Sequence, residues 1–410
     1  MPVTRSQAAR WTRITLAGGG QETLLSEVGA QYLLPLFSTR DACALRLVCR
    51  EFLAAVTEQP WEDAETVIHG SIGAWRACFP RAQCAYVRSS SCLFGEFCPP
   101  SRVRIAPLVD ADFVHFEGLR ELIMVDQVDV TDAAFAHLRG IHTLDMSECD
   151  QAGLTDAAFA HLVGIQVLNM SWCKQLTDAA FPHLRGIQAL DMSSCHQSTV
   201  TSAAFAHLAG IKKLNMNECA AFAIGDDAFV HLRGIEELNM GSCWQPAITD
   251  AAFAQLKGLK VLDVSLCDQF TDAAFAPLAG SLLELDMTSV DGSNPFTDAA
   301  FAHLGSLRKL TMSNCDQPGI TDAAFAHLRS IQRLNMGGCN QPTITDAALT
   351  HLVGIKELEM QGCDQLTGST IACLKGSLEF LDVEGCSPAL ICAAGAAHLP
   401  IGDDAMEQYW

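Results

Sequence analysis

One arrangement of apolar and polar residues recurs from about residue 109 to the C-terminus. Its clearest copy is Thr-Asp-Ala-Ala-Phe-Ala-His-Leu, which begins, with small changes, at Thr131, Thr155, Thr177, Thr271, Thr297 and Thr321. Close variants begin at Thr201, Gly225, Thr249, Thr345 and Thr367, and a weaker copy places Asp110, Phe113, His115 and Leu122 on the pattern. The copies lie 22 to 26 residues apart, a spacing typical of stacked repeats.

A single copy predicts the order helix, turn, strand and loop. Thr155 is a good N-cap, because its hydroxyl can accept a hydrogen bond from a free backbone N–H, and Asp156 suits the positive end of the helix dipole. The pattern predicts a short helix over 157–162. Gly164 can adopt the left-handed conformation that ends a helix, and the apolar spacing over 165–170 predicts a strand.

One such unit cannot bury enough apolar surface to offset the entropy of ordering its backbone. Stacked units share a core, and their strands pair into a parallel sheet at about 4.8 Å spacing. The sequence therefore predicts an α/β solenoid, with the strands on the concave side and short helices on the convex side.

A cysteine closes almost every unit. The column comprises Cys149, Cys173, Cys195, Cys219, Cys243, Cys267, Cys315, Cys339, Cys363 and Cys386. Val290 replaces it once, in the longest unit, next to the insertion 291–295. The pattern L-x-x-L-x-M-x-x-C followed by I/L-T-D resembles the cysteine-containing subfamily of leucine-rich repeats, which implies a horseshoe-shaped solenoid. That subfamily is best known from substrate-recognition subunits of ubiquitin ligases. The near-identity of the copies indicates recent tandem duplication, as in eukaryotic or large eukaryotic-virus families.

Residues 22–61 follow a different, helical pattern. The run R-D-A-C-A-L-R-L-V-C-R-E-F-L-A-A-V, ending in P-W, resembles the second half of an F-box. The resemblance implies that apolar helical residues dock on a Skp1-like adaptor. The implied docking set is Leu24, Leu25, Leu33, Leu34, Leu36, Phe37, Leu45, Val48 and Cys49. The alternative is a helical cap that shields the first repeat of the solenoid.

Four segments follow from these patterns. Residues 1–21 are expected to be disordered, 22–61 form the F-box-like domain, 62–108 are a linker of degenerate repeats, and 109–410 are the regular repeats with a C-terminal cap. Within 62–108 we expect a helix near Ile72 and a strand near Cys84. The cysteines Cys78, Cys84, Cys92 and Cys98 could bind zinc, but their spacing is not the usual paired one. The alternative is that they are small buried residues.

Charge and cysteine usage limit the function classes. Residues 109–410 carry 15 basic and 38 acidic residues, and the whole chain has a net charge of −21. Such a surface argues against nucleic acid and suits a basic protein partner, although it could serve solubility alone. No apolar run approaches the length of a membrane span, and we find no secretory signal. Because the cysteines recur as core positions, we expect an intracellular location, cytoplasmic, nuclear or both.

A histidine precedes the last leucine of most helices. The column is His115, His137, His161, His183, His207, His231, His303, His327 and His351. Stacked imidazoles could bind metal or sense pH, but duplication alone explains the column, and a structural role such as bonding the last helix carbonyls is the alternative. No nucleophile, zinc-protease, P-loop or dinucleotide motif is present. We therefore expect no catalytic function, no metal and no cofactor.

Outward positions of the predicted strands vary between copies, while buried positions stay constant. That contrast is typical of a recognition surface, although exposed positions could also drift freely. The predicted partner-binding residues on this face are Asp145, Asn169, Asp191, Lys213, Asn215, Glu237, Asn239, Asp263, Asp286, Arg333, Asn335, Glu359 and Asp382. Trp172 and Trp244, beside the cysteine column, are candidate aromatic anchors.

Two functions remain open from the sequence. The first is a substrate-recognition subunit of an SCF-type ubiquitin ligase, which binds a Skp1-like adaptor, and through it a cullin, and holds a target protein on the concave face. The second is a non-catalytic interaction scaffold whose N-terminal helices are only a cap. Neither involves nucleic acid or a membrane.

Overall fold

The computed structural model describes residues 50–61, 71–88, 107–289 and 295–402. The chain divides into two compact units, residues 1–175 and 176–410, and each is described by itself. The segment predicted to be disordered, 1–21, and most of the insertion at 291–295 lie outside the described residues.

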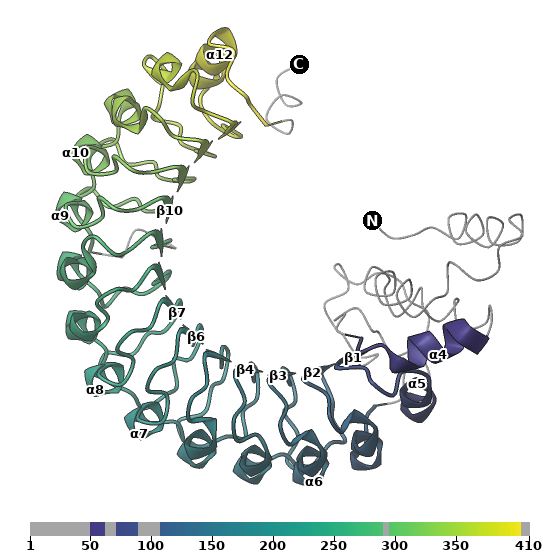
Figure 1. Ribbon diagram of the computed structural model, residues 1–410. Helices are drawn as coiled ribbons and strands as arrows, with labels where there is room; N and C mark the ends of the chain where they lie inside the picture. Colours follow the sequence, from purple (N-terminus) through teal and green to yellow (C-terminus); the bar gives the residue numbers. More distant parts are fainter. Residues whose placement is uncertain (1–49, 62–70, 89–106, 290–294, 403–410) are drawn as a thin grey trace, which may run out of the picture. The chain divides into compact units, whose positions relative to one another are not determined.

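In the described part of the first unit, two helices and a strand precede the regular repeats (Figure 1). Its elements are α4 (Arg50–Glu58), α5 (Ile72–Cys78), β1 (Cys84–Arg88), the 3-10 helix η2 (Asp110–Phe116), β2 (Glu121–Val125), α6 (Asp132–Phe135), η3 (Ala136–Leu138), β3 (Thr143–Asp145), η4 (Asp156–His161) and β4 (Val167–Asn169). Strands β1 to β4 pair in parallel and in sequence order. The helix and strand predicted within 62–108 are therefore confirmed.

Among the described residues of the second unit, nine strands are parallel and in register. Its elements are η5 (Asp178–Leu184), β5 (Ala189–Asp191), α7 (Ser202–Phe205), β6 (Lys213–Asn215), α8 (Asp226–Phe229), β7 (Glu237–Asn239), η6 (Asp250–Gln255), β8 (Val261–Asp263), η7 (Asp272–Leu278), β9 (Glu284–Asp286), α9 (Asp298–Phe301), β10 (Lys309–Thr311), α10 (Asp322–Phe325), β11 (Arg333–Asn335), α11 (Asp346–Leu349), η8 (Thr350–Leu352), β12 (Glu357–Glu359), η9 (Ile371–Leu374), β13 (Phe380–Asp382) and α12 (Pro388–Ala396). Within this unit the strands line the inner side of a curved array and the helices its outer side (Figure 1). The predicted sidedness is confirmed for these repeats.

The predicted short helices are present in the regular repeats. Most are a four-residue α-helix or a 3-10 helix that begins at the acidic residue or its serine replacement, as in η4, which has the expected length and begins one residue before the expected 157–162. A repeat of about 24 residues leaves room for only one or two tight turns. The predicted N-cap is confirmed, since Ala157 N–H donates to Thr155 Oγ1 at 3.2 Å. Gly164, with φ +93°, ends the turn in the left-handed conformation.

The core is a set of stacked columns, one side chain per repeat. The helical phenylalanines, among them Phe253, Phe275 and Phe301, are almost completely buried, as is the central leucine of each strand. Each buried side chain of this size contributes about 1.5–3 kcal/mol relative to its exposed state. Because every column continues into the next repeat, burial in one unit depends on the units on either side.

The acidic residue of each helix also links its repeat to the next one. Its carboxylate accepts the backbone N–H of the following repeat's threonine at 2.7–2.9 Å and that threonine's hydroxyl as well. The rungs of this Thr–Asp ladder are Asp110–Thr131, Asp132–Thr155, Asp178–Thr201, Asp226–Thr249, Asp250–Thr271, Asp272–Thr297, Asp298–Thr321, Asp322–Thr345 and Asp346–Thr367. The sequence indicates that this aspartate suits the helix dipole, but it does not indicate the bonds to the next repeat.

In one rung of the Thr–Asp ladder, both the aspartate and the threonine are substituted. Ser202 stands where other repeats have aspartate, and Gly225 stands where the next repeat would have threonine. Gly225 N–H donates to Ser202 Oγ at 3.3 Å, and that hydroxyl donates to Asp227 Oδ1 at 2.7 Å. The two substitutions therefore compensate for each other, and Asp227 supplies the carboxylate that Ser202 lacks.

The cysteine column forms a second ladder inside the core. Each thiol donates to the carbonyl of the methionine one repeat earlier, at 2.8–3.4 Å, from Cys149, Cys173, Cys219, Cys243, Cys339 and Cys386 among others. Burial raises the pKa of the Cys315 thiol to about 12, so it stays protonated and remains a donor. The prediction that these cysteines are core residues in register is confirmed.

The last strand is covered rather than left open. Helix α12 is capped by Ser387, whose hydroxyl accepts Leu390 N–H at 3.3 Å. Beyond it, Leu381 N–H donates to Pro400 O and Gly402 N–H donates to Leu381 O, both at 2.9 Å. This pairing satisfies backbone groups of β13 that would otherwise form an unpaired sheet edge.

The left-handed glycines make a specific prediction. Replacing Gly354, which has φ +101° and open space at its Cβ position, with alanine should lower the free energy of unfolding by about 1–2 kcal/mol, because an L-residue is strained there. Urea unfolding followed by circular dichroism measures the loss. Gly305→Ala is the matched control. Its φ is not in the left-handed range and its nearest neighbour is 3.6 Å away, so it should not destabilise the protein. Equal losses for the two variants would contradict the strain argument.

Candidate protein-interaction surface

The first and third residues of each short strand point away from the core. The central leucine is buried, whereas its two neighbours are half-buried or exposed in every regular repeat. All thirteen strand residues predicted to bind a partner lie at these two positions. Within each unit the structure therefore places them on one solvent-facing sheet surface, and their role in binding stays a prediction.

The third position has a structural role that the sequence did not reveal. Its side-chain oxygen accepts the backbone N–H two residues later, at 2.9–3.1 Å, in Asp145, Asn169, Asp191, Asn215, Asn239, Asp263, Asp286, Asn335 and Asp382. Such a bond stabilises the turn that follows the strand. The restriction of this column mostly to Asp and Asn is therefore explained by architecture, whereas no such bond restricts the side chain at the first position.

Amide groups of this third column also link neighbouring strands. Asn215 Nδ2 donates to Asp191 Oδ2 at 2.8 Å, and Asn335 Nδ2 donates to Glu359 Oε2 at 2.7 Å. Asp286 lies beside Asp263, and burial, followed by that neighbouring charge, raises its pKa above the ordinary value. The middle of the second unit's sheet therefore presents carboxylates in a partly desolvated setting.

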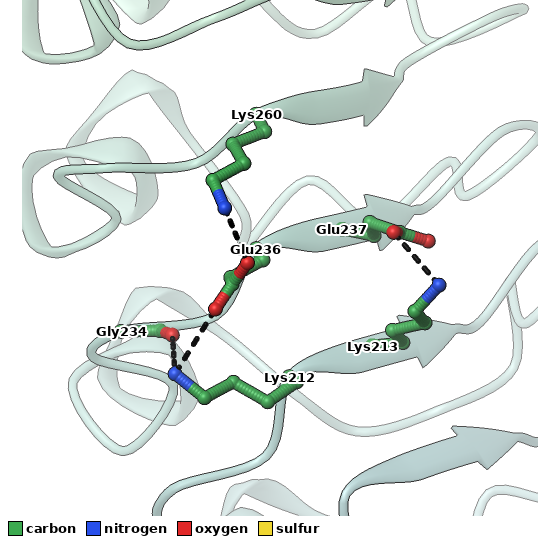
Figure 2. Close-up of polar contacts among 6 residues, drawn as sticks. All are labelled: Lys212, Lys213, Gly234, Glu236, Glu237 and Lys260. Carbon is green, nitrogen blue, oxygen red and sulfur yellow. Dashed lines mark hydrogen bonds and ion pairs between the residues drawn. The ribbon is translucent and has the colours of Figure 1, made fainter.

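Two basic residues at the first strand position, Lys213 and Arg333, are paired with acidic neighbours. Figure 2 shows Lys213 Nζ at 2.8 Å from Glu237 Oε1 on the next strand. Beside this pair, Glu236 lies between Lys260 at 2.5 Å and Lys212 at 3.2 Å, and these two lysines hold the pKa of its carboxyl below the ordinary value. Arg333 forms a further pair with Glu357 at 3.1 Å. These exposed pairs contribute little to stability, but they fix where the charges lie.

The two tryptophans occupy different positions in their repeats. Trp172 precedes its cysteine, has a left-handed backbone with φ +63°, and is 43% exposed, with Lys174 Nζ 5.7 Å from the ring centroid. Trp244 follows its cysteine, is 61% exposed, and donates its indole N–H to Leu266 O. A bulky residue at positive φ is strained, and glycine takes that place in the repeats of Gly338, Gly362 and Gly385.

The predicted adaptor-binding set, Leu24 to Cys49, lies outside the described residues. The end of the F-box-like segment lies within them, and its Trp61 is buried, donates its indole N–H to Val56 O at 2.9 Å, and packs edge-on against Phe79 at 6.0 Å. Gln83 N–H also donates to Trp61 O at 2.8 Å. The end of this segment is therefore fastened to the strand-bearing part of the first unit.

The two metal hypotheses have little support in the described part of the chain. Cys92 and Cys98 lie outside it, and Cys84 is buried, with its thiol 3.7 Å from Glu121 Oε2. No cluster of three or more His, Cys, Asp or Glu side chains suited to a metal occurs among the residues that the structure describes.

Three histidines of the column bond side chains rather than helix carbonyls. His137 Nδ1 lies 2.6 Å from Glu117 Oε1, and Arg185 Nε donates to His207 Nδ1 at 3.2 Å. Arg139 Nη2 approaches His161 Nδ1 at 3.5 Å. For these three, the structural role is a link between neighbouring repeats.

Asp346, the last rung of the Thr–Asp ladder, gives a pH-dependent prediction. Burial raises its pKa, but hydrogen bonds from Ser369, Thr367 and Gly368 outweigh that effect and lower the pKa to about 2. The folded state therefore gains stability that is fully present above pH about 4 and is lost as the pH falls through about 2. Asp346→Asn should cost about 1 kcal/mol at neutral pH, after allowance for solvent screening, and its penalty should shrink in acid. Unfolding curves at several pH values test this, and a penalty that does not change with pH would contradict it.

Comparisons with known proteins support the fold. No family model and no curated protein matches the chain. Among solved structures, a chain of the Toll–Spatzle complex from Drosophila is similar, with a TM-score of 0.52 and 12% identity over 76% of this chain and 45% of that chain. An internalin from Listeria monocytogenes has a TM-score of 0.53 and 18% identity over 71% and 82%. The mouse RP105/MD-1 complex has a TM-score of 0.50 and 15% identity over 79% and 60%.

These likenesses confirm the predicted α/β leucine-rich-repeat solenoid, and at such low identity they show the fold alone. This chain spans less than half the length of the Toll-complex chain that it matches. Across the described residues, no helix is both long enough and apolar enough to span a bilayer.

Proposed function

We propose that this chain is the substrate-recognition subunit of an SCF-type ubiquitin ligase. The F-box-like segment binds a Skp1-like adaptor, and through it a cullin, and the outward sheet face binds a target protein. The observation that carries the proposal is the order of the two parts, a helical segment with F-box character directly ahead of a repeat array. The chain itself supplies proximity rather than catalysis.

The surface chemistry favours protein recognition. The first strand position changes from Thr143 and Val167 to Lys213, Arg333 and Phe380, while the central leucine is constant. A rigid sheet with one variable side chain per repeat presents many combinations of contacts at low entropic cost. Two of the similar folds, Toll with Spatzle and RP105 with MD-1, are seen in complexes with another protein, which is consistent with the proposal.

Free thiols support an intracellular site of action. None of the fourteen cysteines in the described part of the chain forms a disulfide, and most are buried. Disulfides are rare where glutathione keeps thiols reduced, so a protein built on a thiol ladder fits a reducing compartment.

A pull-down with a purified Skp1-like adaptor tests the proposal. The full chain should retain the adaptor, and a variant that lacks residues 1–49 should not. The truncation stops at Arg50, because Trp61 packs on Phe79 and Glu58 of helix α4 pairs with Arg81, so that their removal would expose Phe79. The truncated chain should keep its far-ultraviolet circular dichroism and its unfolding midpoint. No adaptor binding by the full chain would remove the proposal.

A second candidate rests on the burial of Trp61. Its contact with Phe79 and Gln83 is what a helical cap on a solenoid would make. In this alternative the chain is an interaction scaffold with no link to ubiquitin. The scaffold predicts that neither the full chain nor the truncated variant binds the adaptor, so the pull-down separates the candidates.

A further inference from the structure

Two neighbouring loops differ in chemistry from the rest of the array. The residue after the cysteine is charged or carries an amide in most repeats, as in Asp316, Asn340 and Asp364. In the loops 219–225 and 243–248 this position is held by Ala220 and Trp244, which carry neither a charge nor an amide. The exposed residues of these two loops are Ala220, Ala221, Ala223, Trp244, Pro246 and Ala247, which we call the Trp244 patch.

The two loops lie side by side within the second unit. Gln245 Nε2 donates to Cys219 O at 2.5 Å, which places the start of one loop against the start of the other. At their ends, Asp226 N–H donates to Ala247 O at 3.2 Å. Because both ends are joined, the exposed apolar side chains of the two loops form one surface.

Trp244 is held in place although it is largely exposed. Its indole N–H donates to Leu266 O. Its two sequence neighbours are buried and bonded, Cys243 to Met216 O at 2.8 Å and Gln245 to Cys219 O. A rigid aromatic side chain loses little conformational entropy when a partner covers it, which is why such residues dominate binding energy at interfaces.

The patch replaces a bond that other repeats make between successive loops. Asp316 Oδ1 accepts Asn340 N–H at 2.5 Å, and Asn340 Oδ1 in turn accepts Asp364 N–H at 3.2 Å. Ala220 and Trp244 have no side-chain acceptor for this bond. Local chemistry that breaks the repeat pattern and exposes apolar area points to binding.

The charges around the patch select the kind of partner. Glu218, Asp227 and Asp268 are exposed at its rim. Three lysines of neighbouring strands, Lys212, Lys213 and Lys260, lie at the opposite ends of the strands, before the central leucines (Figure 2). An apolar surface with a negative rim favours apolar side chains flanked by positive charge. A second copy of this chain, with net charge −21, would be repelled.

We propose that the Trp244 patch is the docking surface for a segment of the target protein in which apolar side chains are flanked by lysine or arginine. This inference rests on the proposed function, because it names the chemistry of the target that the receptor binds. The indole and the alanines contact the apolar side chains, and the rim carboxylates contact the flanking cations.

Selection of random peptides displayed on phage against the full chain tests the proposal. The enriched peptides should combine apolar residues with lysine or arginine. As synthetic peptides they should bind Trp244→Asp at least about tenfold more weakly than the native chain. Their affinity should also fall when NaCl is raised from about 0.05 to 0.5 M. No enrichment, enrichment of acidic or wholly polar peptides, or equal binding to Trp244→Asp would overturn the proposal.

Two further variants make the result specific. Ala221→Asp places a charge in the patch at an exposed alanine, so it should reproduce the loss even if Trp244→Asp is poorly folded. Val353→Asp makes the same kind of change at a valine that is 65% exposed outside the patch, and it should bind the peptides normally. A sedimentation measurement that showed a dimer sensitive to Trp244→Asp would assign the patch to a second copy and overturn the proposal.

The two proposals fail in different ways. Adaptor binding depends on residues 1–49, so Trp244→Asp should retain the adaptor fully. A chain that binds the selected peptides but no adaptor would remove the ligase function and leave the docking surface. A chain that binds the adaptor but no such peptides would remove the docking surface and leave the ligase function.

Discussion

Replacing Phe301 with alanine is expected to lower the free energy of unfolding by about 3–5 kcal/mol. Phe301 is completely buried in helix α9, in a column that continues to Phe275 and Phe325 in the repeats on either side. The lost aromatic ring would leave a cavity that the fixed spacing of the repeats prevents from closing. Both neighbouring repeats would therefore lose packing partners.

Urea unfolding by circular dichroism gives the total loss, and hydrogen exchange of β9 to β11 shows whether it spreads along the array. Phe301→Leu is the matched control, because Leu349 fills the same position in another repeat. It should cost less than about 1.5 kcal/mol. A loss below about 1 kcal/mol for the alanine variant would show that the repeats tolerate the cavity.

The elements that could be predicted from the sequence are those that depend on local chemistry. Thr155 caps a turn through a bond within its own repeat, Gly164 ends that turn with a positive φ, and the cysteine column is buried. Because the same residues recur at a fixed spacing, each copy confirms the interpretation of the others. The solenoid followed from this repetition.

The features that could not be predicted depend on contacts between repeats or on the sign of φ. Asp132 accepts a threonine 23 residues away, and nothing within one repeat indicates that pairing. Asp145 and Asn169 were assigned to partner binding, yet each also bonds the turn beyond its own strand. Trp172 and Trp244 were grouped together, although one lies before its cysteine with a left-handed backbone and the other lies after it.

The second large effect concerns the Thr–Asp ladder. Asp322 accepts both the N–H and the hydroxyl of Thr345 at 2.7 Å. Asp322→Ser should therefore lower the free energy of unfolding by about 2 kcal/mol, since bonds to a charged acceptor are lost. Thr345→Gly should cost about 1–2 kcal/mol, because it removes the hydroxyl bond to Asp322 and the cap on Ala347 N–H, while the backbone N–H of residue 345 remains.

The chain itself indicates that the two losses are coupled. In two successive repeats, Ser202 occupies the position of Asp322 and Gly225 occupies the position of Thr345. Gly225 N–H still donates a hydrogen bond to Ser202 Oγ. The double variant Asp322→Ser/Thr345→Gly should thus cost about 1 kcal/mol less than the sum of the single variants. Adding Ala347→Asp, which places a carboxylate where Asp227 receives the Ser202 hydroxyl, should recover a further part of the loss.

Urea unfolding of the single, double and triple variants completes the cycle. Costs that add within about 0.5 kcal/mol would mean that the rungs are independent, and the Ser202–Gly225 pair would then be a simple weakness in the array. Coupling would mean that the repeats around Ser202 and Gly225 are joined by an alternative set of hydrogen bonds in place of a Thr–Asp rung. The loops of these repeats could then depart from the repeat pattern, as the Trp244 patch does, without loss of the stacking that holds Trp244 in position.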